Sequence, residues 1–87
     1  MVYTIEFKPS AARDLAKLQQ DIQKRIAAKI NALAREPRPP GVETLAGQDG
    51  LLRLRVGDYR ILYQVLNKVL TILVVRIRHR REVYRDL

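Results

Sequence analysis

The segment LRLRVGDYRILY, at residues 52–63, carries three arginines at spacings that could place them together: Arg53, Arg55 and Arg60. Gly57 and Asp58 form a suitable two-residue hairpin loop, because glycine at the first loop position adopts a positive φ without steric cost. The flanking residues then pair as two antiparallel strands, with Arg55 opposite Arg60. Side chains alternate between the two faces of a strand. The three arginines are therefore predicted to share one face, opposite the face that carries Leu54 and Ile61.

This arginine face is expected to bind an anion. Like charges directly opposite one another destabilise a sheet, and exposed faces usually mix charges of both signs. The sequence pattern indicates no acidic neighbour on this face. The guanidinium group is a planar fork of donors that suits phosphate oxygens. The alternative is a solvated sheet face that binds nothing.

The C-terminal segment contributes a second group of candidate residues: Arg78, His79, Arg80, Arg81 and Tyr84. The three arginines either contact the same anionic ligand or form a basic end that only adds charge. We interpret His79, which stands among these arginines in the sequence, as a bystander or a substrate contact. Tyr84 either belongs to the functional group or anchors the tail on the body, as a lone aromatic residue near a terminus often does.

Several common kinds of site are excluded by residue types. The chain has no cysteine, one histidine and no glycine-rich phosphate loop. A zinc site or a nucleophilic cysteine is therefore ruled out, and the scattered carboxylates do not suggest a metal centre. Ser10 is the only serine, and we expect it to cap a helix. We expect neither a metal nor an organic cofactor.

The charge is high and unevenly distributed. The 87 residues carry a formal net charge of +8. Residues 1–50 hold eight basic and six acidic residues, whereas residues 51–87 hold nine and three. A basic half of this kind favours nucleic acid as the partner, with solubility alone as the alternative. No signal peptide or membrane span is predicted, so we expect a soluble, cytoplasmic protein.

The elements that must position these residues can be read along the chain. Residues 2–7 predict a strand, and apolar residues at helical spacing predict two helices, capped by Ser10 and Asp21. Residues 37–50 contain three prolines and three glycines and predict a long loop. After the hairpin, a turn at residues 67–68 leads into a final strand at 69–77. This strand is apolar on both faces, which is typical of a central position.

The predicted architecture is a single α+β domain spanning residues 1–87, within the broad α/β class. About four strands form a small, mainly antiparallel sheet. The two helices form a helical hairpin that packs on the face bearing Leu54 and Ile61. The arginine face is left open.

The chain resembles the RelE/ParE toxin superfamily, whose fold is also similar to that of microbial ribonucleases. The resemblance rests on RVGDYR at residues 55–60, the valine-rich strand that follows, and HRREVY at 79–84. The first half agrees with it through an N-terminal strand, PSAARDLAKL at 9–18 and a second amphipathic helix. The resemblance covers essentially the whole chain. It is less specific to one branch of the superfamily.

We assign the chain to the RelE branch, because Arg60 and Tyr84 occur together with Arg53 and Arg55. This branch implies a toxin of a type II toxin–antitoxin system, an mRNA interferase that inhibits translation. Such an endoribonuclease cleaves mRNA in the ribosomal A site without a metal, by attack of a ribose 2′-OH on the adjacent phosphate. The ParE branch implies the same fold without the nuclease group, acting on DNA gyrase. A third reading is a basic nucleic-acid-binding module that acts in operon autoregulation.

The resemblance to RelE implies a catalytic set: Arg53, Arg55, Arg60, Arg80 and Tyr84. Arg78, His79 and Arg81 would bind RNA, and Arg78 or Arg81 could replace Arg80 if the spacing shifts. The nuclease branch usually has lysines where this chain has Arg53 and Arg55. Arginine stays protonated, so it stabilises charge but is a poor proton shuttle. Tyr84, flanked by cations that lower its pKa, is the better candidate base.

The resemblance also implies the partners. A cognate acidic antitoxin would wrap the toxin, and the ribosome with its mRNA would be the target. Operator DNA would be bound only through the antitoxin complex. No membrane partner is expected.

Overall fold

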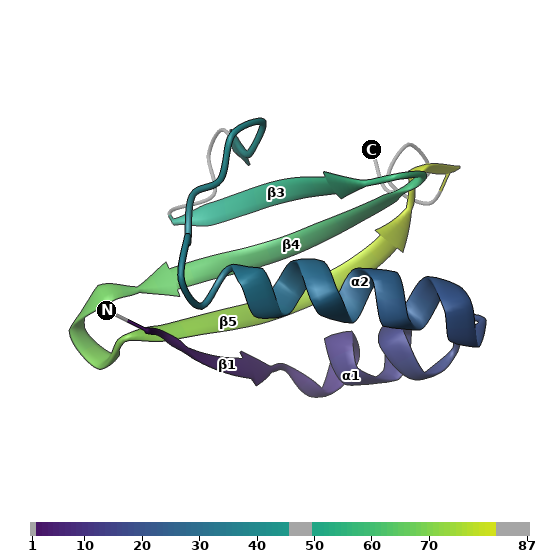
Figure 1. Cartoon of the computed structure of the whole chain (residues 1–87), viewed down its shortest axis with the longest axis horizontal. Coiled ribbons are helices and arrows are strands. Elements are labelled where there is room, and N and C mark those ends of the chain that lie inside the picture. Colours follow the sequence, from purple (N-terminus) through teal and green to yellow (C-terminus); the bar gives the residue numbers. More distant parts are fainter. Residues whose placement is uncertain (1, 46–49, 82–87) are drawn as a thin grey trace.

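The computed structural model describes residues 2–45 and 50–81, and Figure 1 shows their arrangement. Along this part of the chain the elements follow in the order β1 (Thr4–Phe7), α1 (Pro9–Ala16), α2 (Gln20–Ala32), β2 (Glu43–Thr44), β3 (Leu51–Val56), β4 (Tyr59–Leu66), a 3₁₀ turn (Asn67–Val69) and β5 (Thr71–His79). The α+β class predicted from the sequence is confirmed.

The described strands form one five-stranded sheet in the order β1-β5-β4-β3-β2. β1 runs parallel to β5, and the other neighbours are antiparallel. The hairpin register is the predicted one, with Arg55 opposite Arg60 and Leu54 opposite Ile61. Gly57 adopts a φ of 58° at the turn, which its missing Cβ permits. The strand beyond the predicted four is the two-residue β2, which lies in the segment that we expected to be a loop.

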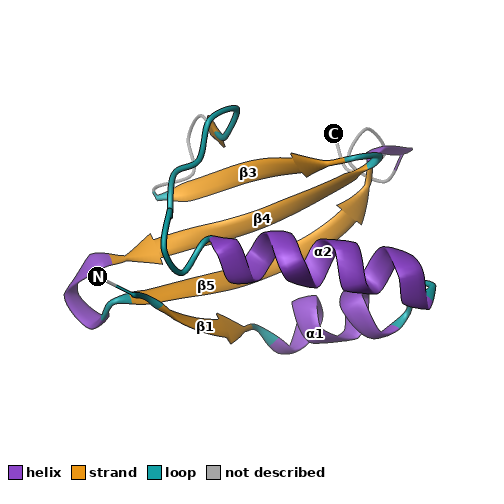
Figure 2. Ribbon diagram, in the orientation of Figure 1, coloured by secondary structure: helices purple, strands orange, loops and turns teal. Residues whose placement is uncertain are grey.

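The core lies between the helices and one face of the sheet, as Figure 2 shows for α2. Ile26 and Ile30 of α2 are completely buried, and they join a cluster with Ile61, Tyr63 and Val74 of the sheet. The hydroxyl of Tyr63 donates a hydrogen bond of 2.6 Å to the carbonyl of Pro37. Burial raises the pKa of Tyr63 to about 12. Tyr63 therefore ties the end of the helical layer to the sheet as a neutral phenol.

Both predicted helix caps are wrong. α1 begins at Pro9, with Lys8 as the N-cap, because proline is favoured at the first helical position. Ser10 lies inside the helix, and its hydroxyl donates to the carbonyl of Val75 at 3.0 Å. α2 has Gln19 as its N-cap, and Asp21 lies in its first turn. A carboxylate there still interacts favourably with the helix dipole.

Two strand boundaries also differ from the prediction. β1 begins at Thr4 rather than at residue 2. β5 begins at Thr71, because the chain before it makes a 3₁₀ turn that ends at Leu70 with a left-handed φ of 46°. β5 then continues to His79, so the strand carries part of the basic tail.

A bulge in β5 changes which side chains face the core. Leu62 pairs with Arg76 and Tyr63 pairs with Val74, so Val75 is the extra residue. Without it, the alternation that turns Ile72 and Val74 inward would also turn Arg76 and Arg78 inward. With it, Ile77 is buried instead. The bulge therefore lets one strand be apolar in its first half and basic on the open face in its second.

Side chains of helix α1 form hydrogen bonds with backbone groups of β5 beyond the point where β1 ends. Ser10 bonds the carbonyl of the bulged Val75. Asp14 accepts from the backbone N–H of Ile77 at 2.9 Å and from Nε and Nη2 of Arg76 at 2.8 and 3.2 Å. These side chains replace the missing strand partner for the carbonyl of Val75 and the backbone N–H of Ile77.

We predict that Asp14→Asn destabilises the fold at neutral pH. Burial raises the pKa of Asp14, but the hydrogen bonds from Arg76 and Ile77 outweigh it, and the net pKa lies below the ordinary 3.8. The Asp14 side chain is only 15% exposed, so losing the charged acceptor costs about 1–3 kcal/mol. Urea unfolding at neutral pH measures this difference.

The difference should disappear in acid. Because the folded-state pKa is lowered, the stabilisation by Asp14 is complete above pH 3.8 and is lost as the pH falls through the lowered value. Glu36→Gln, which changes an exposed carboxylate outside the helices, is the matched control and should change stability little. Equal stability of the wild type and Asp14→Asn at pH 7 would contradict the role assigned to this carboxylate.

Candidate nucleic-acid interface

A row of three arginines crosses the open face of the sheet. Arg55 of β3 lies opposite Arg60 of β4, and Arg60 lies opposite Arg78 of β5. Paired residues on neighbouring strands share a face and lie within reach of each other. The hairpin arginines are thus joined by a tail arginine that the β5 bulge brings into phase. The row concentrates positive charge on one part of the open face.

Arg53 differs from the arginines of this row, because it forms an ion pair with an acidic residue. Its guanidinium Nη2 lies 2.5 Å from Oε2 of Glu43 on β2. The hydrogen bond and the charge of Arg53 lower the pKa of Glu43. The prediction that the arginine face has no acidic neighbour is therefore wrong. The sequence did not reveal this pair, because Glu43 lies in a segment whose composition indicates a loop.

Arg60 is held against the hairpin turn. Its Nη1 donates to the carbonyls of Tyr59, at 3.2 Å, and Gly57, at 3.5 Å. These bonds restrict a long side chain close to the turn. A concavity of about 270 Å³ opens there, and it is lined by Arg55, Gly57, Asp58, Arg60 and Arg80. Three of the predicted catalytic residues, Arg55, Arg60 and Arg80, therefore line one small cavity.

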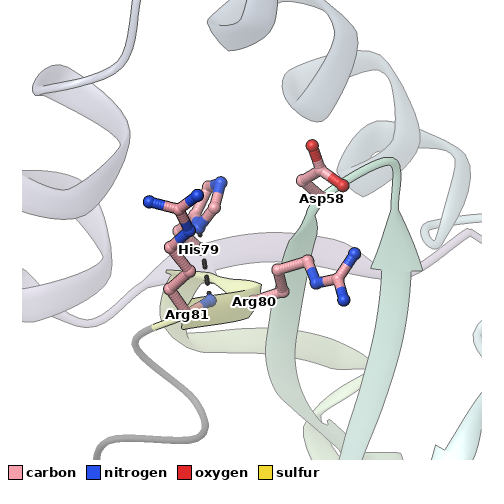
Figure 3. A pocket seen from close by; sticks show the side chains of 4 residues that line it. All are labelled: Asp58, His79, Arg80 and Arg81. Carbon is pink, nitrogen blue, oxygen red and sulfur yellow. Dashed lines mark hydrogen bonds between the residues drawn. The ribbon is translucent and has the colours of Figure 1, made fainter.

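The start of the tail is anchored on the hairpin loop. The backbone N–H of Arg80 donates to the carbonyl of Asp58 at 2.7 Å. Figure 3 shows Arg80 directed toward the β3–β4 hairpin, whereas Arg81 lies beside His79. Together with Asp58 they line a larger hollow of about 650 Å³. This arrangement separates the tail arginines, because Arg80 joins Arg55 and Arg60 and Arg81 does not.

His79 faces the helix side of the sheet. Its ring makes an edge-to-face contact with Tyr59, with 5.2 Å between the ring centroids. Nδ1 accepts a hydrogen bond of 3.3 Å from the backbone N–H of Arg81. His79 thus lies on the other side of the strand from the arginine row. Tyr84, the predicted base, lies outside the described residues.

The described part of the site suits charge stabilisation. Guanidinium groups remain protonated at any working pH, so they can neutralise a developing phosphoryl charge but cannot accept a proton. Among residues 2–45 and 50–81, no three His, Asp or Glu side chains gather to form a metal site. None of the helices in these ranges is long and apolar enough to cross a membrane.

Comparison with known proteins identifies the family. Residues 5–84 match the family described as "ParE toxin of type II toxin-antitoxin system, parDE". The chain belongs to this toxin family. Over 86 residues the toxin is 34% identical to Toxin RelG of Mycobacterium tuberculosis, covering 98% of this chain and 99% of RelG. It is 26% identical to the mRNA interferase toxin RelE of Escherichia coli K12 over 89 residues, covering 99% and 94%.

Solved structures agree with the fold of the toxin. The RelBE2 toxin–antitoxin complex from M. tuberculosis matches with a TM-score of 0.79 and 30% identity, covering 91% of this chain and 99% of that chain. The archaeal RelE–RelB complex from Pyrococcus horikoshii matches with a TM-score of 0.80 and 28% identity, covering 92% and 97%. The toxin is thus a RelE-type member of the superfamily, as the sequence motifs indicated.

The position of Arg55 opposite Arg60 predicts how replacing Arg55 changes the stability of the toxin. Arg55→Thr should stabilise the toxin by about 0.2–1 kcal/mol, because it removes a like-charge pair and introduces a residue that favours strands. Thermal unfolding in low salt measures the change. Added inorganic phosphate should raise the melting temperature of the wild type more than that of Arg55→Thr.

Arg53→Thr is the matched control on the same strand and face. Arg53 lies opposite Leu62 and is paired with Glu43, so its removal relieves no repulsion. It should leave stability unchanged or lower it. A stabilisation as large as that of Arg55→Thr would show that the repulsion between Arg55 and Arg60 is not a significant constraint.

Proposed function

We propose that this toxin is a ribosome-dependent endoribonuclease that cleaves mRNA in the ribosomal A site and so inhibits translation. The observation that carries the proposal is the cavity in which Arg55, Arg60 and Arg80 meet, two strands and the tail each contributing one guanidinium. A cluster of this kind fits the charge of a phosphodiester in its transition state. The mRNA interferase name of the Escherichia coli relative supports the same assignment.

The proposed reaction is a transesterification. The ribose 2′-oxygen forms a bond to the adjacent phosphorus, and the bond from phosphorus to the 5′-oxygen of the next nucleotide breaks. The products are a cyclic phosphate and a free 5′-OH. Arg55 and Arg60 stabilise the charge on the phosphoryl oxygens. Arg80 stabilises the negative charge on the leaving 5′-oxygen, which takes a proton from water to become the free 5′-OH.

Proton transfer must come from outside the arginine cluster. We assign the base role to Tyr84, which takes the 2′-OH proton and whose phenolate the neighbouring cations would favour. The ribosome's part is to hold the message in the geometry for in-line attack, because positioning of the reactants alone contributes much of a rate enhancement.

An acidic antitoxin is the proposed partner. Arg55, Arg60 and Arg78 form the basic surface that such a segment would cover. The archaeal and mycobacterial matches are structures of toxin–antitoxin complexes. Operator DNA would be bound through this complex.

The second candidate is a gyrase inhibitor that cleaves nothing. The observation that favours it is the family description, which names a ParE toxin. The two functions share the fold, so the fold does not separate them. The arginine cavity favours the nuclease, because an inhibitor of gyrase has no need to gather guanidiniums around a phosphate.

The decisive experiment is to map message ends after brief expression of the toxin. Cleavage within the codon in the A site is expected in the wild type. Arg60→Ala should reduce it about 100-fold or more, the effect of removing one preorganised donor, and Tyr84→Phe should abolish it by removing the base. Arg35→Ala, a change at an exposed arginine beyond α2, is the control and should cleave normally. Intact messages with broken chromosomes would overturn the nuclease and indicate gyrase.

The tail arginines provide a separate prediction. Arg80→Ala should slow single-turnover cleavage on programmed ribosomes much more than Arg81→Ala, since only Arg80 lines the cavity with Arg55 and Arg60. A difference of about 100-fold in the rate constant is expected for Arg80→Ala. Equal effects of the two variants, or a larger effect of Arg81→Ala, would contradict the assignment of Arg80.

A further inference from the structure

A groove between α1 and β5 lies next to the arginine site and is not used by the proposed reaction. It has a volume of about 400 Å³, and it is lined by Asp14, Lys17, Leu18, Tyr59, Arg76, Ile77, Arg78 and His79. The groove exists because β1 ends at Phe7, while β5 continues to His79. α1 occupies the vacated edge, and its last turn leaves space beside the strand.

The groove and the arginine cavity are connected through residues that they share with a third hollow. Arg80 and Asp58 line both the cavity at the hairpin turn and the hollow beside it. His79 lines both that hollow and the groove. Arg78 belongs to the arginine row and also lines the groove. The three concavities are therefore neighbours around the end of β5.

The charge of the groove is positive. Asp14 and Arg76 form an ion pair, with Nε and Oδ2 2.8 Å apart, so the two largely neutralise each other. Lys17, at the C-cap of α1, and Arg78 then determine the net charge. Basic side chains in a groove suit the phosphates of a nucleic-acid strand.

The groove also contains an aromatic surface. Tyr59 and His79 meet edge to face within it, with ring planes 88° apart. Single-stranded RNA is recognised by stacking of unpaired bases on aromatic side chains combined with contacts to the backbone. An acidic peptide would use the cations but has no requirement for the aromatic pair.

We propose that this groove is a second binding site of the toxin, which holds a nucleotide that flanks the cleaved phosphate. One base lies against the Tyr59–His79 pair, and its phosphate is bound by Lys17 and Arg78. The inference rests on the proposed nuclease function and extends it, because it assigns a length requirement to the RNA. Only a strand that continues beyond the scissile phosphate would reach α1.

The test measures binding of labelled single-stranded RNA oligonucleotides of increasing length, with 2′-O-methyl groups that block cleavage. Lys17→Glu should weaken binding of the longer oligonucleotides about fivefold in low salt and leave the shortest unchanged. Losing one phosphate contact should also reduce the slope of log affinity against log salt by about 0.7.

Arg13→Glu is the matched control. Arg13 lies in the last turn of the same helix but does not line the groove, so both variants change the net charge and the helix dipole alike. It should bind all oligonucleotides as the wild type does. Equal weakening by the two variants would show a general charge effect and overturn the site.

A cross-link provides the direct readout. Oligonucleotides with 4-thiouridine at successive positions on either side of the blocked linkage should cross-link to α1 from one flanking position, and Lys17→Glu should remove that product. If no position cross-links to α1, the groove proposal is wrong. If Lys17→Glu weakens binding of the acidic antitoxin but not of RNA, the groove is a peptide site and the proposal is also overturned.

The experiments can overturn the groove proposal and the nuclease proposal independently of each other. Loss of cleavage in Arg60→Ala on ribosomes, without any effect of Lys17→Glu on RNA binding, would leave the nuclease standing and overturn the groove. Binding of RNA that depends on Lys17, from a toxin that cuts no message, would leave the groove standing and overturn the nuclease.

Discussion

The contact between α1 and the edge of β5 is the constraint on which the functional surface depends. A bulge at Val75 shifts the alternation of β5, so that a strand with a buried first half can present arginines in its second half. Bulges interrupt the ladder and leave backbone groups to be satisfied. Ser10 and Asp14 supply the missing partners at Val75 and Ile77. Side chains of a helix thus form the hydrogen bonds that a neighbouring strand would otherwise form at this edge. They hold the basic end of β5 in register.

The arginine row follows from that register. Arg78 reaches its place opposite Arg60 only because the bulge precedes it, whereas Arg55 reaches the same neighbour through the hairpin turn. Like charges directly opposite one another weaken strand pairing, so such a row is more typical of a binding surface than of a purely structural one. Arg53, paired with Glu43, is a neighbour of the row rather than part of it.

The hairpin and the tail hold their arginines in different ways. The hairpin is a rigid two-stranded unit, and Arg60 is tied to its turn by two carbonyls. The tail begins where Arg80 bonds to the loop at Asp58. In the proposed reaction, the fixed hairpin stabilises the charge on the phosphoryl oxygens, and the start of the tail brings Arg80 to the same cavity. The groove beside α1 extends the same basic surface to the other face, where an aromatic pair replaces the arginine row.

The sequence by itself determined the hairpin, its loop and the pairing of Arg55 with Arg60, because a two-residue turn and strict alternation are local properties. It also determined the helical hairpin and the family. Only the tertiary structure decided which tail arginine joins the cavity, since the bulge and the bond from Arg80 to Asp58 leave no local signal. The pair of Asp14 and Arg76 joins residues 62 positions apart in the chain, and it forms only when α1 packs against the edge of β5. The pair of Glu43 and Arg53 is only 10 positions apart, but it forms only because a segment with the composition of a loop pairs with β3. Both contacts depend on which segment lies along the edge of a strand, and a short sequence pattern does not determine that.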